Sequence, residues 1–180
     1  MIIIMSRRLS EALRAMATQS RALAAGEHAF HRGDPVSVLF VVVVGRINLL
    51  RFSEAGAVIV LQRAGPGDIL AEASLFSERY HCDAVADCAA SVLCIAKRRF
   101  RGRLRSDATF AEAWARHLGC EIQTMRLRSE LLSLKTVEAR LDAWLACHGE
   151  APAKGVWKQL AHEIGVSPEA LYRELAKRRH

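Results

Sequence analysis

The 180-residue sequence has no long hydrophobic run, and this absence excludes a membrane span. The longest apolar run, Val38–Val44, is far shorter than the roughly 20 residues that cross a bilayer, and we predict that it is a buried strand. The apolar residues 1–5 are followed by Ser6, Arg7 and Arg8, so they fit neither a membrane span nor a secretory signal. We therefore expect no membrane partner.

The sequence also lacks paired cysteines. Its five cysteines include no C-x-x-C pair, which excludes the common zinc-ribbon and thioredoxin patterns. An odd number of cysteines without an export signal is typical of free thiols in a reducing compartment. The expected location is therefore the cytoplasm.

Catalytic signatures are missing as well. The sequence has no Ser-His-Asp arrangement, no phosphate-binding glycine loop and no paired-carboxylate signature, so we expect no enzymatic activity. Basic charge, in contrast, is in excess, since 26 Lys and Arg against 19 Asp and Glu give a net charge of +7. This balance favours a polyanionic partner, nucleic acid first.

The hydrophobic pattern divides the chain into segments that favour different secondary structures. Residues 7–24 are rich in Ala, Leu and Arg, and we predict that they form a helix. From Gly26 to about Ile95, short β-branched runs alternate with turn residues, which favours an antiparallel sandwich or barrel. Residues 109–134 can form one long helix, and residues after 135 can form several short ones. The expected fold class is α+β.

The predicted long helix carries an apolar stripe. Its apolar residues follow one another in steps of four and three, broken only near Ser129. They are Phe110, Trp114, Leu118, Ile122, Met125 and Leu132. Such a stripe needs a partner, which could be the β domain, another helix, or the same helix of a second chain.

The last part of the chain has the anatomy of a helix-turn-helix. A helix over Thr136–Gly149 precedes two short helices around residues 165–167. Ala161 allows a close helix crossing, Gly165 permits a tight turn, and Ser167 is placed to cap the second helix before a proline. In such motifs the second helix enters the major groove of DNA.

Candidate DNA-contacting residues follow from this placement. Glu169 and Arg173 lie four residues apart on one helix face, where Arg could donate to guanine and Glu could accept from cytosine. An ordinary surface ion pair between these two side chains is the alternative. The residues expected at the DNA are Lys158, Ser167, Glu169, Arg173, Lys177 and Arg178, with Arg179 as a further phosphate contact.

Four segments, in this order and followed by the two short helices, resemble one known family. They are "GEHAFHRGD", "LFVVVVGRINLLR", "PGDILAEASLF" and "ARLDAWL". The chain resembles the cyclic-AMP receptor protein / fumarate–nitrate reduction regulator (Crp/Fnr) family of bacterial transcription regulators. The resemblance implies a β jelly-roll sensor domain (1–108), a dimerisation helix (109–134) and a helix-turn-helix DNA-binding domain (135–180). It implies a homodimer that binds double-stranded DNA and responds to an effector.

The sequence departs from the family pattern in two respects. Members carry a β-hairpin wing after the recognition helix, which we expect to be lacking here. In members that bind cyclic nucleotides, a Glu holds the ribose hydroxyl and an Arg–Ser pair holds the phosphate. Glu72 matches that Glu, but Cys82 and Asp83 stand at the Arg–Ser place. Since Asp83 would repel a phosphate, we expect an effector other than a cyclic nucleotide.

The effector site expected from the resemblance comprises Glu72, Ala73, Ser74, Cys82, Asp83 and Arg126. In this set, Arg126 of the long helix would supply the cation that position 82 lacks. No iron–sulfur cluster of the family's N-terminal kind is expected, because residues 1–81 contain no cysteine.

No firm metal site is expected, and the cofactor is unknown. His81 and Cys82 are soft ligands that could take haem iron, zinc or copper, and Arg79 could lower the pKa of the Cys82 thiol for redox sensing. Alternatively Cys82, Cys88 and Cys94 serve as small buried hydrophobes. The alternative function is therefore a small-molecule, haem, metal or redox sensor that acts through protein contacts, with a degenerate DNA-binding half.

Two further histidines, His28 and His31, flank a predicted turn. We expect them to be solvated rather than to bind a ligand.

Overall fold

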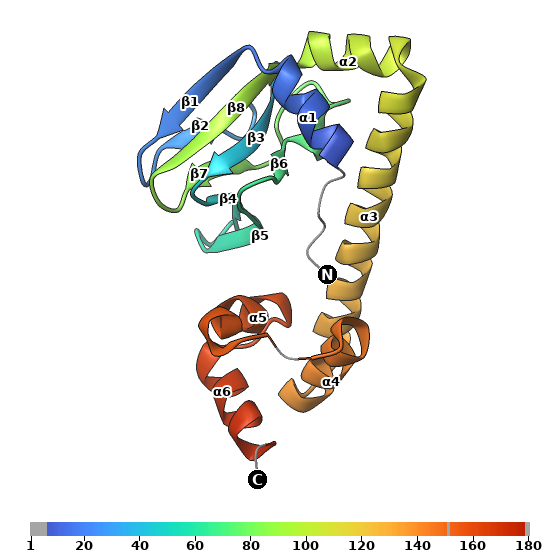
Figure 1. Ribbon diagram of the computed structural model, residues 1–180. Helices are drawn as coiled ribbons and strands as arrows, with labels where there is room; N and C mark the ends of the chain where they lie inside the picture. Colours follow the sequence, from blue (N-terminus) through green and yellow to red (C-terminus); the bar gives the residue numbers. More distant parts are fainter. Residues whose placement is uncertain (1–6, 151, 179–180) are drawn as a thin grey trace. The chain divides into compact units, whose positions relative to one another are not determined.

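The structure, a computed structural model, describes residues 7–150 and 152–178 (Figure 1). The described residues up to His117 form one compact unit, and those from Leu118 onward form a second. The division falls inside helix α3 (Ala108–Ser133), which matches the predicted long helix 109–134. No described helix is both long enough and apolar enough to cross a membrane. The apolar residues 1–5 lie outside the described residues.

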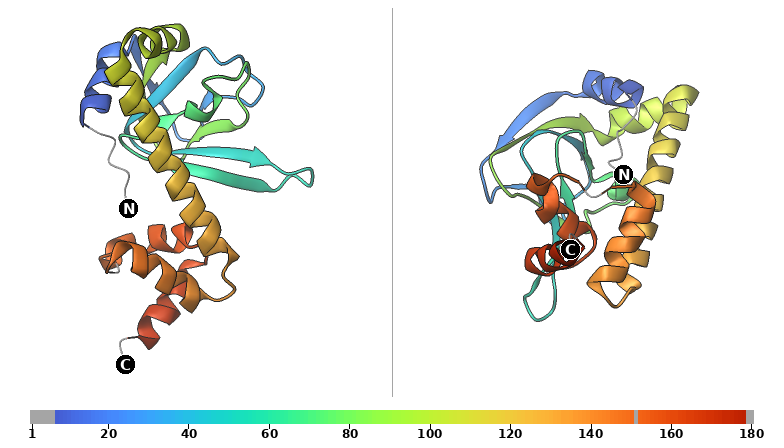
Figure 2. Two further views of the ribbon diagram at one scale, coloured as in Figure 1. Left: turned by 90° about the vertical axis from the view of Figure 1, so that its right-hand side faces the viewer. Right: turned by 60° about the horizontal axis from the view of Figure 1, so that its bottom comes forward.

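The first unit is built on a sandwich of two four-stranded antiparallel sheets, which confirms the predicted antiparallel architecture. The strand orders are β1-β8-β3-β6 and β2-β7-β4-β5. The strands are β1 (Gln19–Leu23), β2 (His28–Phe30), β3 (Val38–Val44), β4 (Ile47–Phe52), β5 (Val58–Ala64), β6 (Ile69–Leu70), β7 (Asp83–Ala86) and β8 (Ala90–Ala96). The β4–β5 hairpin extends beyond the rest of the sandwich (Figure 2).

The interior of the sandwich explains its strand pattern. The run predicted to be a buried strand is β3, whose residues from Leu39 to Val42 are buried. Phe30 stacks on Tyr80 with ring centroids 3.9 Å apart, and the Tyr80 hydroxyl donates to the carbonyl of Val38 at 2.7 Å. Burying an aromatic ring together with a bonded hydroxyl gives a large apolar gain without an unpaired polar group.

The N-terminal segment differs from its prediction. Helix α1 spans Arg7–Met16, not residues 7–24, because the residues after it form the strand β1. This strand pairs with β8 from Gln19 opposite Cys94 to Leu23 opposite Ala90. A helix beyond Met16 would leave this edge of β8 unpaired, so long-range pairing overrides the local helix propensity.

Helix α2 (Lys97–Ser106) and the first part of α3 pack on each other through aromatic rings. Phe100 of α2 is fully buried and meets Phe110 and Trp114 edge-on, with centroids 5.4 and 4.7 Å apart. Phe110 and Trp114 thus form the buried start of the predicted apolar stripe.

The second unit is helical, as predicted. It contains the end of α3, α4 (Val137–His148), a short 3-10 turn η2 (Lys154–Val156), α5 (Trp157–Glu163) and α6 (Pro168–Lys177). The expected start of α4 is confirmed, because the Thr136 hydroxyl accepts from the N–H of Ala139 at 3.1 Å. The core consists of Leu131, Leu141, Trp144, Trp157, Leu160, Ala161, Ile164, Leu171 and Leu175.

Arg140 connects three parts of this second unit. Its guanidinium donates to the carbonyls of Leu132 and Leu134 at the end of α3, at 3.1 and 2.8 Å. It also donates to the carbonyls of Ile164 and Gly165 after α5, at 3.2 and 2.8 Å. These are helix-terminal carbonyls that lack partners within their helices, and a cation is favoured at a helix C-terminus.

Candidate effector pocket and nucleic-acid interface

The expected effector residues of the first unit begin in a constrained turn. Ala71 has φ +73°, a left-handed conformation that is uncommon for a residue with a side chain. It leads from β6 into the short 3-10 helix η1 (Glu72–Ser74). Such backbone strain of about 1–3 kcal/mol persists only where the surroundings fix it, and it concentrates at ligand sites.

Ser74 and His81 tie η1 to the segment that precedes β7. Ser74 is buried, and its hydroxyl lies 2.7 Å from Nδ1 of His81. Burial, followed by the nearby charge of Arg51, lowers the pKa of His81. Ala73, by contrast, is exposed, and its side chain offers no polar group.

Cys82 lies among charged groups but is itself buried, with 1% of its surface exposed. The pKa of its thiol is raised to about 11, mainly by burial; the charge of Arg51 opposes the rise, and those of Glu72 and Asp83 add to it. Cys82 is therefore a protonated thiol near neutral pH. The predicted lowering of this pKa by Arg79 is wrong, since the Arg79 guanidinium donates to the carbonyl of Gly33.

Arg51 is the cation that sequence reasoning missed. Its Nε donates to the carbonyl of His81 at 2.9 Å, and its charge acts on both His81 and Cys82. Arg51 comes from β4, which pairs with β7 through Leu50 opposite Asp83. This pairing joins residues far apart in the sequence, so no local pattern could indicate it.

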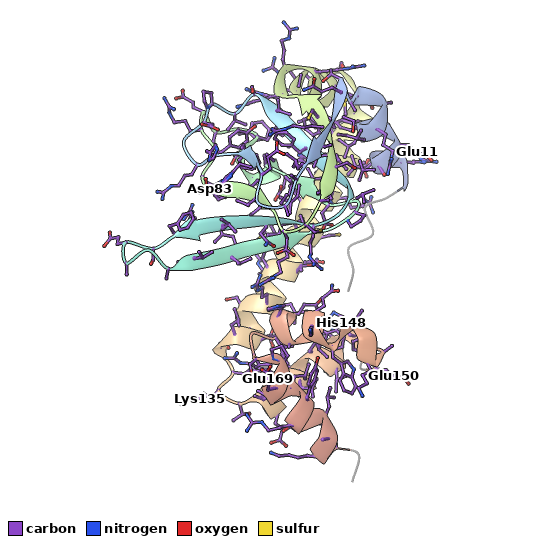
Figure 3. The ribbon with its side chains drawn as sticks, turned by 90° about the vertical axis from the view of Figure 1, so that its left-hand side faces the viewer. Glu11, Asp83, Lys135, His148, Glu150 and Glu169 are labelled. Atoms are coloured by element: carbon purple, nitrogen blue, oxygen red, sulfur yellow. The ribbon has the colours of Figure 1, made fainter. Side chains whose placement is uncertain are left out.

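Asp83 and Arg126 are the two remaining expected effector residues. Asp83 begins β7 (Figure 3), and its Oδ1 accepts from the N–H of Arg32 at 3.1 Å. Asp83 directly follows Cys82 in the chain, and its charge acts on the Cys82 thiol. Arg126 is exposed on the part of α3 that belongs to the second unit.

The other two cysteines of the predicted series do not share a face with Cys82. Cys88 lies in the turn between β7 and β8, and Cys94 is buried in β8 of the other sheet. Burial raises the pKa of Cys94 as well. These positions favour packing roles for both side chains.

In the second unit, α5 and α6 meet through a tight turn. The N–H of Val166 donates to the carbonyl of Ala161 at 2.9 Å, and Ala161 is fully buried at the crossing. Gly165 has φ +67°, which its lack of a side chain permits. The Ser167 hydroxyl accepts from the N–H of Ala170 at 3.2 Å, so the predicted cap is confirmed.

The start of α6 presents charged side chains to solvent. Glu169 and Arg173 are exposed, as is Lys158 on α5. The N–H of Glu169 itself and the hydroxyl of Ser167 lower the pKa of the Glu169 carboxyl, and the charges of Lys158 and Arg173 lower it further. An ionised acceptor and two cations therefore gather at the N-terminal end of one helix.

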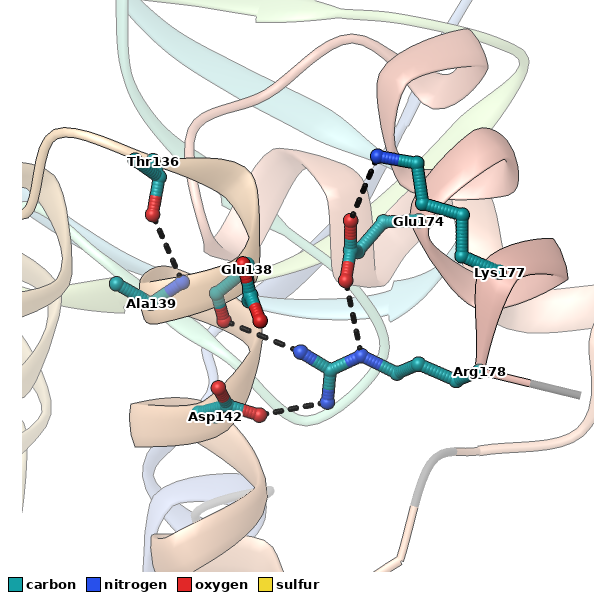
Figure 4. Close-up of polar contacts among 7 residues, drawn as sticks. All are labelled: Thr136, Glu138, Ala139, Asp142, Glu174, Lys177 and Arg178. Atoms are coloured by element: carbon teal, nitrogen blue, oxygen red, sulfur yellow. Dashed lines mark hydrogen bonds and ion pairs between the residues drawn. The ribbon is translucent and has the colours of Figure 1, made fainter. Parts of the chain in front are cut away.

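The end of α6 is fastened to α4 through Arg178 (Figure 4). Its guanidinium donates to Asp142 at 2.6 Å, to Glu174 at 3.1 Å and to the carbonyl of Glu138 at 3.3 Å. The nearby Lys177 is largely exposed, with its Nζ 3.8 Å from Glu174. Arg178 thus donates its hydrogen bonds within the second unit, whereas the charged group of Lys177 is exposed at the surface. Arg179 lies outside the described residues.

The later part of the α3 stripe is open. Ile122, Met125 and Leu132 are 49, 56 and 44% exposed, and Leu118 is half-buried. These positions, together with Ser129, continue a four-three spacing, which is the seam pattern of paired helices.

Comparison with known proteins identifies the first unit. Residues 20–107 match the family model of the cyclic nucleotide-binding domain. Most of the chain shares the fold of solved Crp/Fnr-type proteins. The resemblance drawn from the sequence is thereby confirmed, including the β jelly roll and the long helix. No curated protein sequence matches the chain.

Three solved structures illustrate this fold. The catabolite activator protein of Thermus thermophilus is 23% identical, with a TM-score of 0.59 over 97% of this chain and 84% of that one. The c-di-GMP responsive global regulator CLP of Xanthomonas campestris is 20% identical, with a TM-score of 0.63 over 96% and 91%. The N-terminal domain of a transcriptional regulator from Streptomyces coelicolor is 27% identical, with a TM-score of 0.55 over 68% and 86%. Each is described as a regulator or activator.

Proposed function

We propose that the protein is a homodimeric DNA-binding transcription regulator whose sensor domain responds to an effector other than a cyclic nucleotide. The observation that carries the proposal is the exposed, capped start of α6, which offers Glu169 and Arg173 beside Lys158. The division into sensor domain, dimerisation helix and DNA-binding domain is part of the same proposal.

In this proposal α5 and α6 form a helix-turn-helix, with α6 as the recognition helix. Arg173 donates to a guanine edge and Glu169 accepts from a cytosine amino group, since both protrude at the end that enters the major groove. Lys158 and Lys177 contact phosphates. Because Arg178 already donates to Asp142 and Glu174, its role is to hold α6 in place.

The dimer is proposed to form through α3. The exposed side chains of Ile122, Met125 and Leu132 form a seam that a second copy of the helix would cover. Burying a half-exposed apolar side chain contributes about 1 kcal/mol, so the three residues of two chains contribute about 6 kcal/mol before entropy costs.

The charges around Cys82 support an effector without a phosphate. Glu72 and Asp83 both act on this position, and Arg51 alone opposes them. A cyclic phosphate placed there would meet more negative than positive charge, which a phosphate site cannot tolerate. Titration calorimetry with cyclic AMP, cyclic GMP and cyclic di-GMP should give no binding heat, and micromolar binding of any of them would refute this part.

DNA binding is tested by fluorescence anisotropy at low salt, with the duplex upstream of the protein's own coding sequence and a scrambled duplex of equal length. Arg173→Ala should remove most of the preference for the upstream duplex, because a base contact distinguishes sequences by about 1–3 kcal/mol. Lys177→Ala should weaken both duplexes alike. Arg126→Ala, an exposed cation outside the proposed interface, is the matched control.

If the wild type binds neither duplex at low salt, the DNA-binding proposal fails. That result would favour the alternative function, a sensor that acts through protein contacts.

A further inference from the structure

Three side chains that could bind a metal gather at one edge of the sandwich. Within residues 7–150 and 152–178, His28, His31 and Asp83 form the one group of three or more potential ligands whose donor atoms all lie within 4.8 Å of one another. His28 is half-buried, His31 is exposed and Asp83 is buried. We propose that these residues bind a divalent first-row transition metal ion such as Zn²⁺.

An irregularity in β2 brings the two histidines together. In a regular strand, residues three apart point to opposite faces. Here His28 lies opposite Val85 but Phe30 lies opposite Ala84, so the register shifts by one residue between them. A bulge of this kind re-aims a side chain and commonly occurs next to functional sites. As a result the rings of His28 and His31 stack with centroids 4.1 Å apart.

The distance between His31 and Asp83 fits two ligands of one ion. Nδ1 of His31 lies 3.5 Å from Oδ1 of Asp83, which is long for a hydrogen bond. Two ligands of a tetrahedral Zn²⁺ with bonds of about 2.0–2.1 Å are about 3.3–3.4 Å apart. The donor atoms of all three side chains lie within 4.8 Å of one another, so a shared ion requires the His28 ring to rotate towards the other two.

The carboxylate is held in place by the backbone. Oδ1 of Asp83 accepts from the N–H of Arg32 at 3.1 Å, and the N–H of His31 donates to Asp34 at 2.9 Å, which fixes the turn after β2. Such outer contacts orient metal ligands. Two imidazoles and one carboxylate with an open fourth position suit Zn²⁺ and its neighbours better than Mg²⁺ or Ca²⁺.

The bound ion would tie the end of β2 to the start of β7. It would use Asp83, one of the expected effector residues, together with two histidines outside that set, and its binding can be measured without DNA. It is separate from the predicted metal candidates His81 and Cys82, since His81 pairs with Ser74 instead.

The test is titration of the tag-free, metal-stripped full chain with Zn²⁺ in a calorimeter. The wild type should bind one ion per chain. His31→Gln and Asp83→Asn should each weaken binding by at least tenfold, since even outer-sphere partners change metal affinity by about 10–100-fold. His162→Gln, an exposed histidine on α5, and His81→Gln should bind as the wild type does.

Thermal melting gives a second readout. Zn²⁺ should raise the melting temperature of the wild type and not of His31→Gln, whose exposed position makes it safe for folding. The proposal is overturned if the wild type binds no Zn²⁺, or if His31→Gln binds it as tightly as the wild type does. Loss of binding in His81→Gln alone would likewise overturn it.

Discussion

Replacing Arg140 by alanine should destabilise the second unit far more than replacing an exposed arginine elsewhere in the same unit. Arg140 donates to four main-chain carbonyls, two at the end of α3 and two after α5. Without Arg140, the carbonyls at the ends of α3 and α5 lose their cationic donor, and the link that Arg140 makes between these two helix ends is lost.

The magnitude follows from the exposure of the four bonds. The bonds to Leu134 and Ile164 are partly buried, whereas those to Leu132 and Gly165 are exposed and their carbonyls can bind water instead. A hydrogen bond to a charged group contributes about 1.5–3 kcal/mol when buried and much less when exposed. The expected loss is about 2–4 kcal/mol, close to the whole stability of a unit of this size.

Urea unfolding followed by tryptophan fluorescence measures this loss. Trp144 and Trp157 report on the second unit, and Trp114 of the first unit is replaced by phenylalanine in every variant. Arg140→Ala should lower the midpoint strongly, and Arg126→Ala serves as the control. A midpoint for Arg140→Ala equal to that of Arg126→Ala would refute the reasoning.

Three further predictions concern single side chains. With its pKa raised to about 11, the Cys82 thiol is about one part in a thousand thiolate at pH 8, so iodoacetamide should label the exposed Cys147 first. Peptide mass mapping that finds Cys82 and Cys147 labelled at equal rates would contradict this. Because the pKa of Glu169 is lowered in the fold, its ionised carboxylate stabilises the protein above about pH 4.5, and this effect is lost as the pH falls below the folded pKa. The melting temperatures of wild type and Glu169→Gln should therefore differ at pH 7 and converge at low pH. A difference that stays constant with pH would contradict a lowered Glu169 pKa. Met125→Glu should raise the dimer dissociation constant by at least about 30-fold in sedimentation equilibrium, since each of two chains loses about 1 kcal/mol of burial; an unchanged constant would exclude this seam.

Sequence patterns over a few residues predicted those features of the fold that depend mainly on neighbouring residues, such as a helix cap and the extent of a helix. The cap at Ser167 lies where the sequence predicted it, because a hydroxyl before a helix can accept from a nearby main-chain N–H, and α4 begins directly after Thr136, as expected. The long helix also lies where its periodicity indicated. The segment Gln19–Leu23 was missed because its partner strand β8 lies some 70 residues away in the sequence.

The candidate sites were harder to predict for the same reason. Arg51 reaches His81 only through the pairing of β4 with β7, and His28 meets His31 only through a register shift. Arg178 was assigned to DNA from its charge alone, and its internal partner Asp142 lies on a different helix. Residue type indicates what a side chain can do, but long-range pairing decides which groups it meets.

Native mass spectrometry of the protein mixed with its own upstream duplex at low salt tests the central claim most directly, because one spectrum reports both association and DNA binding. The expected species is a complex of two chains with one duplex. This complex should weaken steeply as salt is raised, since phosphate contacts release counterions. A spectrum with only single chains and free duplex, or with one chain bound per duplex, would rule out a DNA-binding homodimer.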